Sequence, residues 1–124
     1  MLNQSEVTRK RGTARKTILV DEFNSTALSC MVSDVGVSEE GGRKLIKAGT
    51  PVAGDLQSRQ TPFTVAADGT GAVGVILHDV DVTKGTANSQ VVIFGFIDVS
   101  KLDDSVVPMV TAAADKLKMI QFVK

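Results

Sequence analysis

Two apolar runs rich in β-branched residues constrain the fold of this chain more than any other feature of its sequence. They span residues 73–83 (VGVILHDVDVT) and 90–99 (QVVIFGFIDV), and the connection between them at 84–88 is rich in turn-forming residues. β-branched and aromatic residues bounded by Gly, Asp and Asn are typical of strands and turns, so we predict two strands that form a hairpin. The second run is apolar on both faces by the two-residue period of a strand, which predicts a central place in a sheet.

The rest of the chain repeats this pattern on a smaller scale. Further short strands are predicted at 17–20, 27–32, 44–48 and 63–65, with a turn at 36–42 and a long polar loop at 53–62. Towards the C-terminus, apolar residues recur three and four positions apart from Val106 to Ile120, which predicts a helix over 105–118, followed by a strand at 119–123. At 124 residues, one domain is expected. The sequence therefore predicts a mainly β (α+β) domain at 17–124, a small β-barrel or β-sandwich-like body with one C-terminal helix.

Charge divides the chain at residue 16. The whole sequence has 14 Lys and Arg against 14 Asp and Glu, but residues 1–16 hold five basic residues against Glu6 alone, a local charge of +4. Residues 17–124 hold nine basic residues against thirteen acidic ones, a charge of −4. Because few of the first sixteen side chains are apolar, burial cannot offset the entropy lost when they become ordered. We predict a flexible basic N-terminal arm.

A basic arm of this kind has three interpretations, and the sequence leaves them open. The arm is a solvated tail, a segment that folds onto a protein partner, or a contact to nucleic acid. Neutralising up to five phosphates predicts that affinity falls with salt at a log–log slope of about −4.5. The chain has no Trp or Tyr and five Phe, which disfavours a platform for base stacking. Nucleic acid is therefore the least favoured of the partners.

Three motifs of cofactor or catalytic chemistry lack the context that they need. Residues 69–74 (GTGAVG) match G-x-G-x-x-G, but a dinucleotide site requires a helix after the motif, and a predicted strand follows here. His78 precedes Asp79, but neighbouring residues of a strand face opposite ways. Cys30 lies in an apolar run and is interpreted as a core residue rather than as a nucleophile paired with His78. We expect a protein that is not an enzyme and has no cofactor and no metal.

Several broad classes are also disfavoured. The apolar runs are far shorter than the ~20 residues of a membrane span, and residues 1–16 lack the apolar stretch of a signal peptide. The single cysteine cannot form a disulfide framework. We expect a protein made in the cytoplasm, with no membrane partner.

Three segments carry a resemblance to a known family. They are residues 47–52 (KAGTPV), 72–83 (AVGVILHDVDVT) and 92–97 (VIFGFI). In this order, with a basic arm before them and a short helix after them, they resemble the head decoration proteins of tailed phages, of the lambda decoration-protein type and its relatives in phages of Gram-positive bacteria. The resemblance covers residues 44–124, and the arm fits by character rather than by motif.

The resemblance implies a non-enzymatic virion protein that binds the outer surface of a phage capsid where capsomers meet, commonly as a trimer. The arm would bind the major capsid protein, often by extending one of its sheets, and the expanded shell would then resist the internal pressure of DNA. The residues expected to make this contact are Arg9, Lys10, Arg11, Arg15, Lys16, Thr17, Ile18, Leu19 and Val20. The loop at 53–62 is a candidate for contact with the shell or within the trimer. Two alternatives stay open: another virion component, such as a connector or tail piece, and a small nucleic-acid-binding protein.

Overall fold

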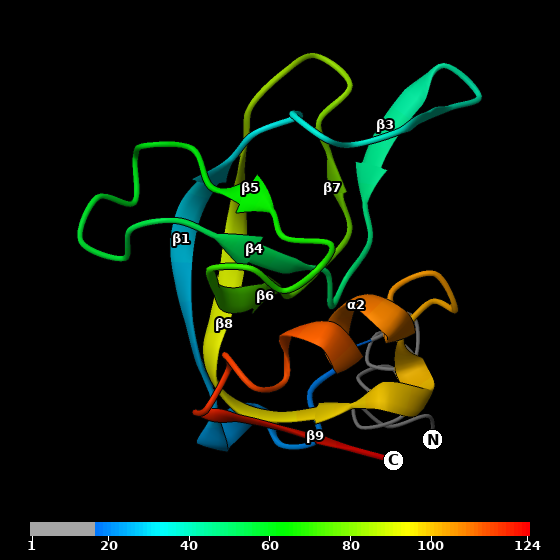
Figure 1. Cartoon of the computed structure of the whole chain (residues 1–124). Helices are drawn as coiled ribbons and strands as arrows, with labels where there is room; N and C mark the ends of the chain where they lie inside the picture. The colour runs from blue at the N-terminus through cyan, green and yellow to red at the C-terminus, as the bar shows by residue number, and fades with distance from the viewer. Residues whose placement is uncertain (1–16) are drawn as a thin grey trace, which may run out of the picture.

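The chain forms two sheets, in which most strand pairs are antiparallel, and one α-helix (Figure 1), as a computed structural model that describes residues 17–124 shows. The main sheet has the order β1–β8–β6–β4–β5, with β9 also paired to β8, and a smaller sheet has the order β2–β3–β7. The main sheet consists of β1 (Thr26–Val32), β4 (Pro51–Ala53), β5 (Thr64–Val65), β6 (Ala72–Ile76), β8 (Ala87–Asp98) and β9 (Ile120–Val123). The smaller sheet consists of β2 (Glu39–Glu40), β3 (Arg43–Ile46) and β7 (Val80–Asp81), and the helical elements are η1 (Glu22–Asn24), η2 (Val99–Lys101) and α2 (Val107–Ala113).

The predicted fold class is confirmed: the described residues are mainly β, with one α-helix near the C-terminus. Within residues 17–124 neither sheet closes on itself, so the closed barrel that was one of the two expected forms is not present. The long loop predicted at 53–62 is confirmed between β4 and β5. The predicted turn at 36–42 is narrower than expected, because Glu39–Glu40 pairs with Arg43–Lys44 and leaves Gly41 and Gly42 to make the turn.

The predicted central strand is confirmed as β8, which is the longest strand that the structure describes. Its first half pairs with β1 on one side and with β6 on the other. Its second half pairs in parallel with β9 and, on its other side, contacts residues 18–20. The prediction that β8 is covered on both faces is wrong for the second half, where Phe94 and Phe96 are exposed.

The strand predicted at 73–83 is in fact two strands in different sheets. β6 pairs with β8 as expected, but β7 pairs with β3. Between them the chain bends at residues 77–79, where the Asp79 carboxylate accepts a hydrogen bond from the Ala48 N–H at 2.8 Å. This side chain holds the bend against the turn that follows β3, so the strand cannot continue straight.

Two groups of buried apolar side chains form the core, one on each side of the first half of β8. The helix-side core gathers buried residues from the α2 region, from both halves of β8 and from β9, among them Val92, Ile97, Val106, Val110, Leu117 and Ile120. The loop-side core lies beneath the 54–63 loop and the smaller sheet, and includes Cys30, Val32, Ile46, Phe63, Ile76, Val80 and Val91. The helix is shorter than predicted, ending at Ala113, but Leu117 N still donates to Ala113 O at 3.1 Å. The apolar spacing therefore keeps its buried face beyond the helix end.

Candidate functional site

The structure describes part of the predicted attachment segment. Thr17, Ile18, Leu19 and Val20 lie within the described residues, whereas Arg9, Lys10, Arg11, Arg15 and Lys16 lie outside them. Ile18 and Leu19 are buried in the helix-side core, and Val20 is exposed. The segment was predicted to be a strand, and it forms an isolated bridge between Leu19 and Ile97 instead. Of the apolar side chains at 17–20, Val20 is therefore the one that faces solvent in this fold.

Residues 17–20 and β1 follow the same edge of β8 and together resemble one broken strand. The Val20 N–H donates to Phe96 O at 3.0 Å and the Asp98 N–H donates to Ile18 O at 2.8 Å, and further along the same edge Thr26 pairs with Phe94. Between these two stretches, residues 21–25 leave the edge as a bulge that contains η1, seen in blue at the lower end of β1 (Figure 1). Gly95 lies opposite this bulge.

Side-chain hydrogen bonds within the bulge fix its shape. Asp21 Oδ1 accepts from the Phe23 N–H at 3.0 Å, Asp21 Oδ2 accepts from Asn24 Nδ2 at 2.6 Å, and the Ser25 hydroxyl donates to Glu22 O at 2.9 Å. The side-chain bond from Asn24, followed by the backbone bond from Phe23, lowers the pKa of Asp21. The turn presents Phe23 with 97% of its surface exposed. An apolar ring on a well-bonded turn is a feature that the sequence analysis missed.

A second set of exposed apolar side chains lies on β8 and the segments beside it. Because Leu19 and Ile97 form a buried bridge, the next pair, Val20 and Phe96, points to the opposite face. On the β9 side, Gly95 N donates to Met119 O at 3.2 Å, and Met119 is exposed where the following Ile120 is buried. We call this set the outer apolar surface, and it consists of Val20, Phe94, Phe96 and Met119. Exposed apolar residues gathered in one place are typical of interaction sites.

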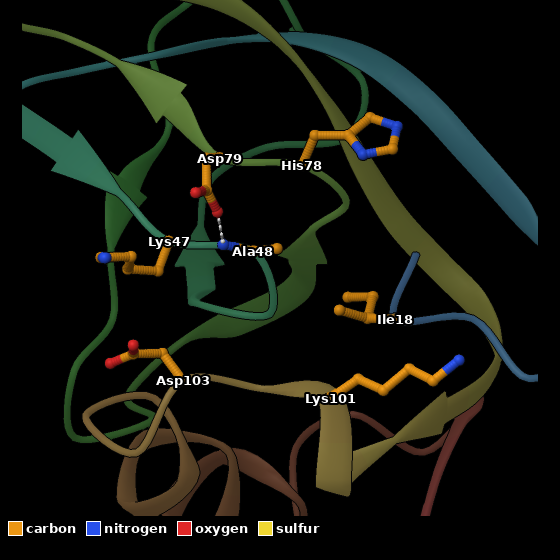
Figure 2. A pocket seen from close by; sticks show the side chains of 7 residues that line it. All are labelled: Ile18, Lys47, Ala48, His78, Asp79, Lys101 and Asp103. Carbon is orange, nitrogen blue, oxygen red and sulfur yellow. Dashed lines mark hydrogen bonds between the residues drawn. The ribbon is translucent and has the colours of Figure 1, made fainter. Parts of the chain in front are cut away.

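A hollow of about 680 Å³ lies on the other side of residue 18 (Figure 2). It is lined by Ile18, Lys47, Ala48, His78, Asp79, Lys101 and Asp103. The side chains of Lys47 and Lys101 point away from each other in Figure 2, and Asp79 is directed to the Ala48 N–H. The hollow therefore mixes both signs of charge and does not focus its cations on one point.

The residues considered for chemistry are not brought together. His78 lines the hollow of Figure 2, whereas Cys30 lies beside a different hollow that includes Arg59. Burial raises the pKa of the Cys30 thiol, which disfavours the nucleophilic thiolate. Among residues 17–124, no group of three or more His, Cys, Asp or Glu side chains is placed to hold a metal ion.

The glycine-rich motif at 69–74 has a packing role. Gly69 and Gly71 have φ of +83° and +71°, and the chain continues into β6 rather than into a helix. A Cβ on Gly69 would lie 2.6 Å from Ala112 O, so the absence of a side chain lets this turn touch α2. The interpretation of the motif as a turn is confirmed.

The loop after β4 is held to the edge of β1. Met31 N donates to Arg59 O at 3.1 Å, Phe63 N donates to Met31 O at 2.8 Å, and the Arg59 guanidinium donates to Ser29 O at 3.1 Å. The loop is exposed over residues 57–62 and buries Phe63 beneath it. Its contact with a shell or with another copy stays a prediction.

No family model matches the sequence, and no curated protein matches it. In the part of the chain that the structure describes, no helix is long and apolar enough to cross a membrane.

Proposed function

We propose that this chain is a non-enzymatic structural protein of a tailed-phage head. It binds the major capsid protein on the outer surface of the virion and stabilises the expanded shell against the internal pressure of DNA. The resemblance supports this function, because its three segments contribute to β4, β6, β7 and β8. Three of these strands, β4, β6 and β8, are neighbours in the main sheet, so the resembling segments belong to one structural unit.

The observation that carries the proposal is the position of the outer apolar surface. It includes Val20, which lies four residues after Lys16, the last residue of the basic segment. The apolar surface and the charge of +4 are therefore joined at the same end of the body. A partner that covers both would gain from burial of apolar area and from charge attraction.

The basic segment contributes most if it lies extended along the partner. An extended segment can add a strand to an exposed sheet edge, where backbone hydrogen bonds supply affinity. Its five cations favour a partner surface with acidic side chains. Residues 17–20, already bridged to β8, connect this added strand to the core.

Binding stabilises the shell by mass action. A protein that binds the expanded shell and not its precursor favours the expanded state by about 2.7 kcal/mol per site when its free concentration is 100 times the dissociation constant. Because the shell offers many equivalent sites, these contributions add over the whole surface. Copies that also contact one another, as a trimer would, distribute the load among neighbouring capsomers.

The test is co-sedimentation with empty expanded capsids of the phage that encodes the chain. The full-length protein is compared with a form that lacks residues 1–16 and with a full-length variant in which the five basic residues of that segment are replaced by Gln. We expect the intact protein to occupy the shell symmetrically and both variants to lose most of their binding while keeping the wild-type circular dichroism. Lys84→Gln, in the turn before β8, is a control that should bind normally.

Four outcomes would contradict parts of the proposal. Failure of the intact protein to bind capsids would overturn the function. Normal occupancy by the truncated form would remove the role of the basic segment. Binding to DNA with a log–log salt slope near −4.5 would favour the nucleic-acid alternative, and binding at a single vertex would favour a connector.

A further inference from the structure

β9 has one edge that no other strand of the described chain covers. On its other side it pairs in parallel with β8, from Gly95 opposite Ile120 to Asp98 opposite Val123, and within residues 17–124 it pairs with nothing else. In Figure 1 it is the red strand along the lower side of the body. An open strand edge presents unpaired backbone groups to other chains. The open edge of β9 is therefore a place where another chain can add a strand.

The register of β9 shows which backbone groups face this open edge. Gly95 N donates to Met119 O at 3.2 Å, and in a parallel pair the residues that bond the neighbouring strand recur at every second position. The odd-numbered residues of 119–123 therefore turn their backbone groups to β8, and Ile120 and Phe122 turn theirs to the open edge. The Ile120 N–H is already bonded within the turn before β9. The carbonyl of Ile120 and both backbone groups of Phe122 are left to accept and donate hydrogen bonds.

Apolar side chains border the open edge on both faces of the sheet. Phe122 is half-buried against the helix-side core, and Met119, on the opposite face, belongs to the outer apolar surface. An added strand would cover the remaining surface of both side chains, because its own side chains alternate between the two faces. The occupant that fits is an extended segment with apolar residues at its centre.

Lysines flank the open edge. Residues 114–124 hold Lys116, Lys118 and Lys124 against Asp115 alone. All three lysines are exposed, and none of them forms an ion pair within the part of the chain that the structure describes. If extended, the six residues from Lys118 to Lys124 span about 20 Å. A cation therefore lies beside each end of the open edge.

The other acidic groups at this end of the body are directed elsewhere. Asp98 lies opposite Val123 in register, but its carboxylate accepts from the Ser100 N–H at 3.0 Å and from the Ser100 hydroxyl at 2.6 Å. The acidic residues of the bulge at 21–25 follow the other edge of β8, so β8 separates them from β9. The border of the open edge is therefore positive.

We propose that an extended acidic segment of the partner protein adds a strand to the open edge of β9. The inference rests on the proposed function, which makes the major capsid protein that partner, and it adds a contact in which this chain supplies the sheet. Charge disfavours a second copy as the occupant: an antiparallel pair of β9 strands centred on Gln121 would place Lys118 of each copy opposite Lys124 of the other. Acidic residues six positions apart on a partner segment would instead meet both lysines.

The first test uses the full-length protein and the peptide Glu-Val-Thr-Val-Thr-Val-Glu, without capsids. NMR measures the affinity of the peptide and the hydrogen exchange of each backbone amide. We expect bound peptide to slow exchange of the Phe122 amide, because this N–H gains an acceptor. The same peptide with Lys in place of both Glu should bind at least about tenfold more weakly. Lys118→Gln should weaken binding of the acidic peptide about two- to fivefold, whereas Lys84→Gln, in the turn before β8, should not.

The second test removes the hydrogen-bond donor at the open edge. Replacing the backbone N–H of Phe122 with an ester oxygen keeps the phenyl side chain and deletes a bond to the partner. The same replacement at Val123 is the control, because that N–H is turned to β8. In co-sedimentation with expanded capsids, the Phe122 ester should bind about fivefold more weakly than the intact protein. The Val123 ester should bind normally and unfold at a lower temperature.

The results separate this inference from the proposed function. If the intact protein does not bind capsids, the proposed function is overturned, and the peptide test still decides the inference. If capsids bind the two esters equally well, the inference is overturned and the proposed function is not. Unchanged exchange of the Phe122 amide at millimolar acidic peptide also overturns the inference. Exchange at Phe122 that slows with protein concentration alone would show that a second copy occupies the edge, which overturns it as well.

Discussion

The second half of β8 is more apolar in sequence than the first half, but it is the less completely covered of the two. In the first half, Val91 and Val92 are neighbours that point to opposite faces, and both are fully buried. Val91 belongs to the loop-side core and Val92 to the helix-side core. In the second half, Ile97 is buried on the helix side, whereas Phe94 and Phe96 have no core above them and are exposed.

This difference shows that one face of the second half of β8 lacks a covering layer. The loop-side core covers the first half of β8, since the smaller sheet and the 54–63 loop reach it. Over the second half that layer is missing, and the outer apolar surface occupies its place. A partner protein would supply the missing layer there, and this is why the proposed capsid contact is placed at that end.

The largest effect is expected from neighbouring residues of the second half. Ile97→Ala deletes a fully buried side chain and leaves a cavity in the helix-side core, so the free energy of unfolding should fall by about 3 kcal/mol. Phe96→Ala deletes a side chain that is 44% exposed, and the free energy of unfolding should fall by about 1 kcal/mol or less. Urea denaturation followed by circular dichroism measures both.

Binding should reverse the order of these two variants. Phe96→Ala should lower capsid occupancy at a concentration where it is fully folded, because it removes part of the outer apolar surface. Ile97→Ala should bind normally at temperatures where it stays folded. Equal decreases in the free energy of unfolding for the two variants would mean that Phe96 is covered within the body. The distinction between a buried and an exposed face in the second half of β8 would then be wrong.

Gly95 tests how the second half accommodates the bulge at 21–25. Its φ is +142°, a conformation that other residues rarely adopt, and a Cβ there would also press on Ser25. Gly95→Ala should therefore reduce the free energy of unfolding by about 2 kcal/mol. Gly85→Ala is the matched control: its φ is +114°, but a Cβ there meets open space, so backbone strain alone should cost about 1 kcal/mol.

The difference between the two glycine variants isolates the contact with the bulge. Thermal unfolding at matched protein concentration gives the decrease in the free energy of unfolding for each variant. Equal decreases in the free energy of unfolding at the two positions would show that the bulge moves aside without destabilising the fold. The bulge would then be less rigid than its hydrogen bonds indicate.

Local patterns predicted the strands well where burial alternates. The residues predicted at 27–32 form most of β1, and Cys30 is buried, as its interpretation as a core residue predicts. The helix was placed correctly although its end was not, because the apolar face continues through turns to Leu117 and Ile120. The spacing of apolar residues indicates which side chains are buried, and it is less informative about the backbone hydrogen bonds between them.

Features that depend on distant contacts were not predictable in this way. The split between β6 and β7 depends on the Asp79 carboxylate meeting the Ala48 N–H, thirty-one residues away. The exposure of Phe94 and Phe96 depends on the absence of a layer above them, which no local pattern reports. At the candidate site, burial of Ile18 and Leu19 follows from their bridge to β8. Asp21, Asn24 and Ser25, three turn-forming residues after a short apolar run, were the available signal for the bulge.

The smallest effect is expected at the polar edge of the other end, where β7 lies near the first half of β8. The Thr83 hydroxyl and N–H, followed by the Arg43 guanidinium, lower the pKa of Asp81 to about 2 from a usual value of 3.8. Because the folded pKa is the lower one, the charged carboxylate stabilises the fold above about pH 4, and this contribution is lost as pH falls from about 4 through 2.

Asp81→Asn should lower stability near neutral pH and flatten the acid limb of the stability curve, measured by urea titrations at each pH. Asp98→Asn, at the end of β8 where Ser100 lowers the carboxyl pKa, is the comparison at the opposite end. If the free energy of unfolding of Asp81→Asn changed with pH in parallel with that of the wild type between about pH 4 and 2, the charged Asp81 carboxylate would not stabilise the fold.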